Sequence, residues 1–328
     1  MRTRLVRTVL AGIAAFVMVS QGVAAQEAEQ EFDCETLREM EKATTEEQWL
    51  ERTLWASHCY VFQARAVNIS DIGVRTLALS HQIQDGLQQQ VVQFLDGPSV
   101  NFERQGRVGL VRWANDSDDS VNASPTGLVH HINDHYRLSL MGEERIAGRQ
   151  AVRLDITPQD DLRFAHRWWL DKKSGLVLKQ VLVDRQNRLL ETFQITQLQS
   201  PRLYEGKVKL DKPRTKSERS WRPQWLPPGF VAQPVNTHSD PDALLRHQVF
   251  SDGLAAISIF VEPLAEQSAL APGRHRLGVS IAIVHQREFQ GDVWQLVVLG
   301  EVPAPVLERV AQSIELSESV TAPSTTRG

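Results

Sequence analysis

The stretch RFAHRWWLDKKSGLVLKQVLVDRQNRLLETFQITQ, residues 163–197, decides the fold. It holds three short runs rich in β-branched and aromatic residues, at 163–171, 176–184 and 189–197, and each gap between them has the length and the turn residues of a hairpin. The pattern predicts an antiparallel meander. Leucine alternates with valine in the middle run, so both faces of the sheet must be covered. We expect helices to pack on one face and the other face to line a groove.

More strand-like runs precede this stretch, and they extend the predicted meander toward the N-terminus. Residues 33–54 have helical spacing instead, with acidic residues between the apolar ones, and a short helical segment is expected at 127–135. The sequence therefore predicts a large α+β domain at residues 26–200. The runs that we interpret as its earlier strands are 59–69, 75–83, 88–96, 100–104, 107–113, 136–146 and 150–158.

A basic segment follows the large domain. Residues 202–222 hold eight Lys or Arg against three Asp or Glu, with little hydrophobic periodicity. We interpret residues 201–222 as a linker, which is either a site for an acidic partner or a solvated connection. We expect residues 223–316 to form a smaller α+β domain of short strands with a helix that begins near Pro305. Residues 317–328 are expected to form a disordered tail.

The N-terminus has the features of a secretory signal peptide, residues 1–25. Arg2, Arg4 and Arg7 precede an apolar run, and small residues end at Ala25. The run is shorter than the roughly 20 residues that span a bilayer core, which disfavours the alternative of a retained anchor. Loss of these three arginines changes the formal net charge from −4 to −7. An acidic, exported chain is not expected to bind nucleic acid.

The chain has two cysteines, Cys34 and Cys59. Their spacing excludes a CxxC redox pair, and two cysteines alone cannot build a zinc site. In an oxidising compartment they are able to form a disulfide, and two unpaired buried thiols are the alternative.

Motifs for catalysis are missing from the sequence. There is no GxSxG elbow, P-loop or HExxH. His131 and His135 have a spacing that could hold a metal on a helix, but without a third ligand we interpret them, with His130, as surface histidines. The pair Asp160-Asp161 reads as a solvated turn, and His166 as a packed side chain. We therefore predict a binding protein without a metal or cofactor, and rank a periplasmic enzyme last.

Several stretches together resemble the RseB/MucB family of periplasmic negative regulators of the envelope-stress sigma factor. They are YRLSLMGEERIAGRQAVRLDITPQD, RWWLDKKSGLVLKQVLVDRQNRLLETFQ, WRPQWLPPGF, VFSDGLAAISIFVEP and VLGEVPAPVLERVAQSI, and they occur in order from about residue 30 to residue 316. The resemblance implies a half-open antiparallel β-barrel closed by helices, similar to the lipoprotein carriers LolA and LolB, followed by a smaller domain. It also implies that the chain binds an RseA/MucA-type anti-sigma factor and shields it from the site-1 protease. Lipopolysaccharide or a related lipid would release that block, and the chain would self-associate.

The resemblance gives the basic segment a candidate target, because lipid phosphates and acidic peptide residues both accept charge-assisted hydrogen bonds. Trp221 is expected to pack in the cleft between the domains. For Trp225 the cleft is one hypothesis, and core packing is the interpretation that we favour. A lipid carrier of the LolA type is the alternative function. The cationic candidates for binding lipid or peptide are Lys207, Lys209, Lys212, Arg214, Lys216, Arg219 and Arg222.

Overall fold

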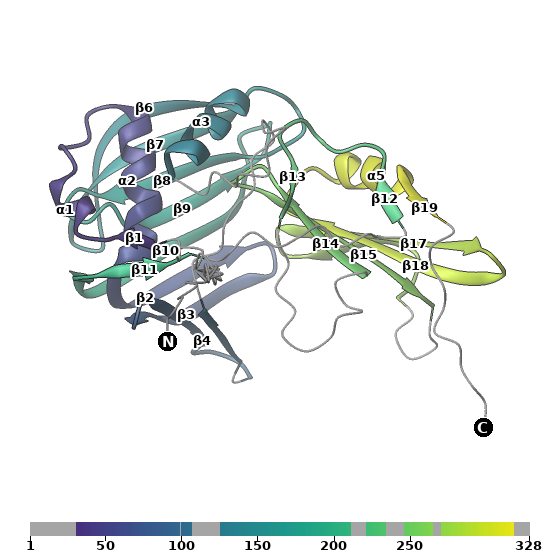
Figure 1. Cartoon of the computed structure of the whole chain (residues 1–328), viewed down its shortest axis with the longest axis horizontal. Coiled ribbons are helices and arrows are strands. Elements are labelled where there is room, and N and C mark those ends of the chain that lie inside the picture. The colour runs from purple at the N-terminus through teal and green to yellow at the C-terminus, as the bar shows by residue number, and fades with distance from the viewer. Residues whose placement is uncertain are drawn as a thin grey trace, which may run out of the picture.

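The computed structural model describes residues 31–98, 100–106, 125–210, 221–233, 246–264 and 270–317. Two β-rich domains lie side by side, the first with helices against its sheet and the second with helix α5 (Figure 1). The predicted signal peptide and residues 318–328 of the predicted tail lie outside the described ranges. No helix within those ranges is both long and apolar enough to cross a membrane.

The large domain is built on one nine-stranded antiparallel sheet, in the order β5-β4-β3-β2-β10-β9-β8-β7-β6. In the described part of the chain β5 and β6 are its two edges, so the sheet is open, in agreement with the α+β class and a half-open rather than a closed barrel. Pairing of β10 with β2 joins the last long strand to the first. The strands are β2 (Tyr60–Ser70), β3 (Gly73–Gln84), β4 (Leu87–Phe94), β5 (Asn101–Gly106), β6 (Tyr136–Ile146), β7 (Arg149–Pro158), β8 (Ala165–Asp171), β9 (Val177–Val183) and β10 (Leu189–Leu203).

Within the described ranges, the helices of this domain are α1 (Thr36–Glu39), α2 (Glu46–Cys59) and α3 (Pro125–His135). Helix α2 begins with a capping box, in which the Thr45 side chain accepts a hydrogen bond from the Gln48 backbone N–H, and the Gln48 side-chain oxygen accepts one from the Thr45 backbone N–H. Helices α2 and α3 lie across the part of the sheet formed by β7 and β8 (Figure 1). Apolar side chains from both helices and both strands form one buried core there.

A short second sheet fastens the start of the domain to its end. Strand β1 (Glu31–Asp33) pairs with β11 (Lys207–Lys209), next to a disulfide between Cys34 and Cys59 whose Cα atoms are 5.4 Å apart. Both cysteines are fully buried with Leu37, Trp55 and Val208. The bridge therefore holds the β1–β11 pair against the C-terminal end of α2.

The small domain has a six-stranded antiparallel sheet in the order β13-β14-β15-β18-β17-β16. Helix α5 (Ala304–Gln312) packs on it through Val306, Leu307 and Val310, and its early proline confirms the predicted helix start. A two-stranded sheet of β12 and β19 completes the domain. The strands are β12 (Trp221–Pro223), β13 (Val231–Gln233), β14 (His247–Ser251), β15 (Ala256–Pro263), β16 (Gly273–Leu277), β17 (Ser280–Phe289), β18 (Asp292–Gly300) and β19 (Ile314–Leu316).

The segment that we interpreted as a linker, 201–222, contributes to both domains. Strand β10 continues to Leu203, β11 follows it in the large domain, and β12 pairs with β19 in the small domain. Residues 211–220 lie outside the described ranges.

Candidate functional site

The predicted basic residues are only partly described. Lys207 and Lys209 lie on β11, where the Nζ of Lys207 is 3.6 Å from a carboxylate oxygen of Glu31. The side chain of Arg222 is 77% exposed and lies 4.0 Å from Glu315. Lys207 and Arg222 thus keep largely exposed cationic groups at the two ends of the segment. The other candidates, Lys212, Arg214, Lys216 and Arg219, lie outside the described residues.

The two tryptophans lie in the small domain. Trp221 is 4% exposed and belongs to the core of that domain, so in this conformation it offers little surface to a ligand in the interdomain cleft. Trp225 is partly buried against the same core, and the guanidinium of Arg309 lies 3.8 Å from its ring centroid. The structure thus shows core packing for both side chains, which corrects the expectation of the cleft for Trp221 and agrees with the core packing favoured for Trp225.

Residues 227–230, with the sequence PPGF, contact the large domain. Gly229 has φ +83° and lies so close to α3 that an added Cβ would be 2.2 Å from Nε2 of His135. Its carbonyl oxygen accepts a hydrogen bond from Nε2 of His131 at 2.8 Å. His131 is 8% exposed, so its interpretation as a surface histidine is wrong. Burial, and next the charges of Arg163 and His131, lower the pKa of His135.

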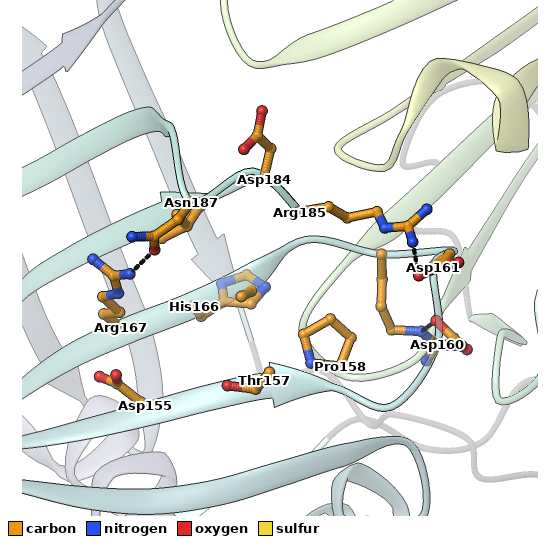
Figure 2. A pocket seen from close by; sticks show the side chains of 13 residues that line it. Asp155, Thr157, Pro158, Asp160, Asp161, His166, Arg167, Asp184, Arg185 and Asn187 are labelled. Atoms are coloured by element: carbon orange, nitrogen blue, oxygen red, sulfur yellow. Dashed lines mark hydrogen bonds and ion pairs between the residues drawn. The ribbon is translucent and has the colours of Figure 1, made fainter.

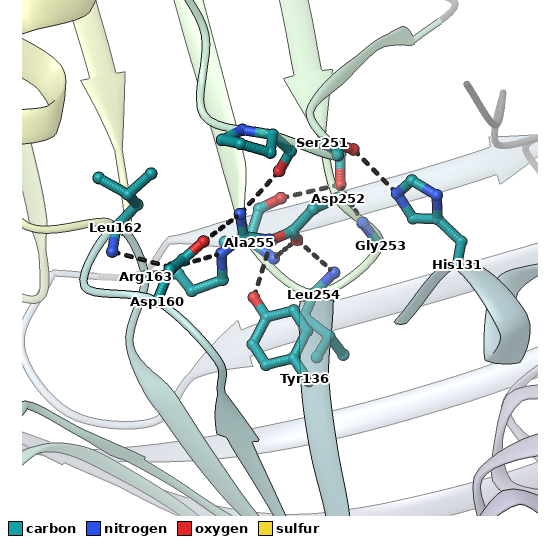
Figure 3. Close-up of polar contacts among 12 residues, drawn as sticks. His131, Tyr136, Asp160, Leu162, Arg163, Ser251, Asp252, Gly253, Leu254 and Ala255 are labelled. Atoms are coloured by element: carbon teal, nitrogen blue, oxygen red, sulfur yellow. Dashed lines mark hydrogen bonds and ion pairs between the residues drawn. The ribbon is translucent and has the colours of Figure 1, made fainter. Parts of the chain in front are cut away.

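Arg163 is the centre of the contact between the domains (Figure 3). Its side chain is fully buried, although it comes from the loop between β7 and β8. Nη1 donates to Asp252 of the small domain at 2.8 Å, and Nη2 donates to the carbonyl oxygen of Pro228 at 2.7 Å. The guanidinium also lies over the rings of Tyr136 and Phe230, at 5.3 and 5.5 Å from their centroids. One cation thus contacts both domains through charge, hydrogen bonds and ring faces.

Asp252 is the acceptor that the small domain provides for Arg163. It lies in the turn between β14 and β15, is fully buried, and accepts backbone hydrogen bonds from Leu254 and Ala255 at 3.0 and 2.8 Å. Its second oxygen accepts from the hydroxyl of Tyr136 at 2.8 Å. Burial, and then the Asp252 charge, raise the pKa of Tyr136, which keeps that hydroxyl protonated as a donor.

Asp160 completes the group and corrects the interpretation of Asp160-Asp161 as a solvated turn. Its two oxygens accept from Nε and Nη2 of Arg163 at 3.2 and 3.0 Å, so Asp160 holds the guanidinium from its own domain. Asp161 does stay near solvent, in an exposed ion pair with Arg185. We call the group of Tyr136, Asp160, Arg163, Asp252 and the Pro228 carbonyl the junction.

The domains also meet at a second place, which we call the clasp. Asp71, in the turn between β2 and β3, lies 3.1 Å from Arg276 on β16, and both side chains are largely exposed. Ile72 lies beside Gly278, where an added Cβ would be 3.6 Å from its Cδ1 atom. The clasp is thus solvated, whereas the junction is buried.

An apolar surface crosses the half of the large sheet formed by β10, β2, β3, β4 and β5. Strand register places this surface on the helix-bearing face, because Phe193 is level with Gln180, Gln180 with Trp168, and Trp168 with Leu154 under the helices. The expected division, with helices on one face and a groove on the other, is therefore wrong for this surface. Two cross-strand rows form it, which we call the apolar rows: Ile195-Ala66-Leu77-Phe94 and Ala64-Leu79-Val92-Phe102.

The apolar rows are most open at the β5 edge. Phe102 is 60% exposed and makes an edge-to-face contact with Phe94, whose ring centroid is 6.0 Å away. Near the opposite end of the rows, Ala64 and Ile195 are buried and Ala66 is fully buried. The surface thus changes from buried to open along each row, and hydrocarbon chains are the ligands that such a surface suits chemically.

A cavity of about 330 Å³ lies near the junction, where β7 and β9 end and β8 begins (Figure 2). Its polar lining includes Asp155, Asp184 and the Arg185–Asp161 ion pair, so it does not suit a hydrocarbon chain. His166 is buried beside it, in contact with the rings of Tyr136 and Trp168, as expected for a packed side chain. Burial lowers the pKa of His166 to about 4. In the described ranges, no group of three or more His, Cys, Asp or Glu side chains is arranged to hold a metal ion.

Comparison with known proteins gives matches to both domains. The model of the MucB/RseB N-terminal domain matches residues 45–219, and that of the MucB/RseB C-terminal domain matches residues 215–315. A Pseudomonas aeruginosa protein named sigma factor AlgU regulatory protein MucB is 31% identical over 292 residues, which cover 81% of this chain and 89% of that protein. The sigma-E factor regulatory protein RseB of Escherichia coli K12 is 23% identical over 287 residues, or 79% and 87% of the two chains.

Solved structures agree with these matches. A chain in the complex of Pseudomonas aeruginosa MucA and MucB is 30% identical and superposes with a TM-score of 0.61, covering 83% of this chain and 98% of that one. A chain in the structure of MucB with the periplasmic part of MucA is also 30% identical, with a TM-score of 0.60 and coverage of 83% and 99%.

Proposed function

This chain belongs to the MucB/RseB family, and we propose that it binds the periplasmic region of an RseA/MucA-type anti-sigma factor and so controls an envelope-stress sigma factor. The family consists of regulatory binding proteins rather than enzymes. The observation that carries the proposal is the superposition, at 30% identity, on chains solved in complex with MucA. That likeness covers 83% of the chain. We place the protein in the periplasm, where the predicted signal peptide would direct it.

We propose further that binding shields the anti-sigma factor from site-1 proteolysis and that lipopolysaccharide or a related lipid ends this protection. The apolar rows support the lipid part, since they offer acyl chains a surface that is open at Phe102 and buried at Ala66. Exposed cations at Lys207 and Arg222 flank the basic segment, where phosphates or acidic peptide residues would be held.

Protection from proteolysis is directly measurable. The periplasmic segment of the anti-sigma factor is incubated with its site-1 protease, with and without the mature protein, and then with added lipopolysaccharide. We expect slow cleavage in the presence of the protein and restored cleavage when lipid is added. Equal cleavage rates with and without the protein would contradict the shielding function.

The basic segment has its own test. Replacing Lys212, Arg214 and Lys216 by Glu should weaken lipopolysaccharide binding and reduce its dependence on salt, because fewer phosphates are then neutralised by the protein. Binding that is unchanged at low salt would remove the segment from the lipid site. Light scattering during the lipopolysaccharide titration measures the molar mass of the protein, and it would show whether the protein self-associates, as the resemblance implies.

A lipid carrier of the LolA type is the second candidate, and the apolar rows are the observation that favours it. The two functions differ in what the protein binds. A carrier would take up lipid without affinity for the anti-sigma segment, whereas a regulator needs both. Lipid uptake by a protein that does not bind the segment would favour the carrier.

A further inference from the structure

The two contacts between the domains differ in how firmly they are made. The junction joins a fully buried arginine to a fully buried aspartate, while the clasp joins side chains of Arg276 and Asp71 that are 62% and 42% exposed. Exposed ion pairs are worth little, whereas removing one partner of a buried pair leaves an uncompensated charge. The junction therefore constrains the two domains more strongly than the clasp does in the described structure.

The junction also constrains direction. A guanidinium is planar, and its donors point along fixed lines. In Arg163 these lines end on Asp160 of the large domain and on Asp252 and Pro228 of the small domain, with donor–acceptor distances of 2.7–3.2 Å. Rotating the small domain would move the latter two acceptors off those lines while Asp160 keeps the guanidinium in place. The network is thus satisfied at one interdomain angle.

The loop on the small-domain side is equally restricted. Gly229 has no room for a side chain against His135, and its carbonyl oxygen is bound by His131 from α3. Helix α3 therefore holds the small domain one residue after the Pro228 carbonyl that Arg163 binds. Two separate elements of the large domain thus hydrogen-bond to the PPGF turn: the β7–β8 loop through Arg163, and α3 through His131.

We infer that Arg163 and Asp252 are positioning residues that set the angle between the two domains, and thereby the surface that the anti-sigma segment meets. The inference rests on the proposed function, since that segment is the ligand whose binding would report the angle. When only a fraction of molecules has the competent angle, the apparent dissociation constant rises by the inverse of that fraction. Loss of the junction should thus weaken binding even though both side chains are fully buried in the described structure.

The experiment measures angle and binding separately. Met141→Cys and Val293→Cys place one spin label on each domain, at positions that are 57% and 39% exposed. Because Cys34 and Cys59 form a disulfide, only the introduced thiols react. Distances between the labels are measured by pulsed electron resonance, and affinity for the periplasmic segment of the anti-sigma factor is measured by calorimetry.

The test variant is Arg163→Met, and Tyr136→Phe is the milder second variant in case the first does not fold. The control is Arg185→Met, which removes an arginine of an exposed ion pair nearby, where the side chains are 55% and 63% exposed. We expect one narrow distance distribution in the parent and the control, a broad one in Arg163→Met, and affinity reduced roughly tenfold if a tenth of the molecules keep the competent angle.

Each outcome decides a different claim. A narrow, unshifted distance distribution in both junction variants would overturn the positioning role. A broad distribution with unchanged affinity would overturn the link between the angle and the ligand. Failure of the parent protein to bind the segment would instead count against the proposed function, and the distance measurement would still decide whether Arg163 sets the angle.

Discussion

Removing the disulfide tests how the large domain is held together. Cys34 and Cys59 are 25 residues apart in sequence, and closing a loop of that length in the unfolded chain corresponds to about 3.5 kcal/mol of stability at room temperature. At the 2–4 °C per kcal/mol typical of domains of 150–250 residues, Cys34→Ala/Cys59→Ala should melt roughly 7–14 °C below the parent. Calorimetry gives the melting temperature, and urea unfolding followed by circular dichroism gives the free energy.

Both cysteines are fully buried, so the substitutions also remove two sulfur atoms from the core around α2. Parent protein that is refolded in the presence of a reductant provides the control, because it keeps both thiols and lacks only the bond. If this sample and the double variant each lose less than about 1 kcal/mol, the bridge is not what holds the β1–β11 pair, and the loop-entropy reasoning fails for this domain.

Three further predictions concern other parts of the structure. Gly229→Ala should lower the free energy of unfolding far more than Gly291→Ala does. Both glycines have a positive φ, but only at Gly229 would a Cβ meet another residue, the Nε2 atom of His135 at 2.2 Å. Equal free energies of unfolding for the two variants would contradict this. For His166 the folded-state pKa of about 4 lies below the ordinary 6.5, so the unfolded chain binds the proton first as the pH falls. The free energy of unfolding should therefore fall as the pH is lowered from 6.5 to 4, by about 1.4 kcal/mol per pH unit from this group. In His166→Leu the free energy of unfolding, measured with urea at each pH, should depend less steeply on pH over this range. Phe94→Glu should weaken lipopolysaccharide binding roughly tenfold by placing a charge in the apolar rows, whereas Met141→Glu, on an exposed part of β6, should leave lipid fluorescence titrations unchanged.

Local patterns in the sequence were sufficient for most strands of the described ranges, but not for the break in the helical segment expected at residues 33–54, where α1 ends at Glu39 and α2 begins at Glu46. The runs around residues 163–197 became β8, β9 and β10 because alternation and turn residues act over a few positions. The helix near Pro305 followed from an early proline and an apolar stripe, and both features are present in α5. Helix α2 extends to Cys59, which we had expected to begin a strand, since helix ends are set by only one or two residues.

The junction could not be predicted in the same way. Arg163 and Asp252 are 89 residues apart, and neither the apolar period of the predicted run 163–171 nor a local motif marks Arg163 as buried. The SDGL stretch contributes to the family resemblance, but the resemblance does not mark Asp252 as buried. The sequence feature that could have indicated the contact is the pair of opposite charges, Arg163 at the start of the apolar run 163–171 and Asp252 in a predicted turn of the other domain.

The position of the apolar rows was missed for a geometric reason. Leucine and valine alternate in β9, so the sequence shows that both faces are apolar without showing which face the helices cover. Only the register between β9, β10 and β2 places Phe193 and Ile195 on the same face as Trp168. Likewise, Trp221 was expected in the cleft because tryptophan suits interfaces, and its pairing with Leu316 placed it in the core.

The most direct test of the account is calorimetric titration of the mature protein with the periplasmic segment of the anti-sigma factor, with and without lipopolysaccharide. The account predicts saturable binding of the segment and a loss of that binding when lipid is present. Absence of binding to the segment, with lipid still taken up, would contradict the regulatory function and leave a lipid carrier as the better description.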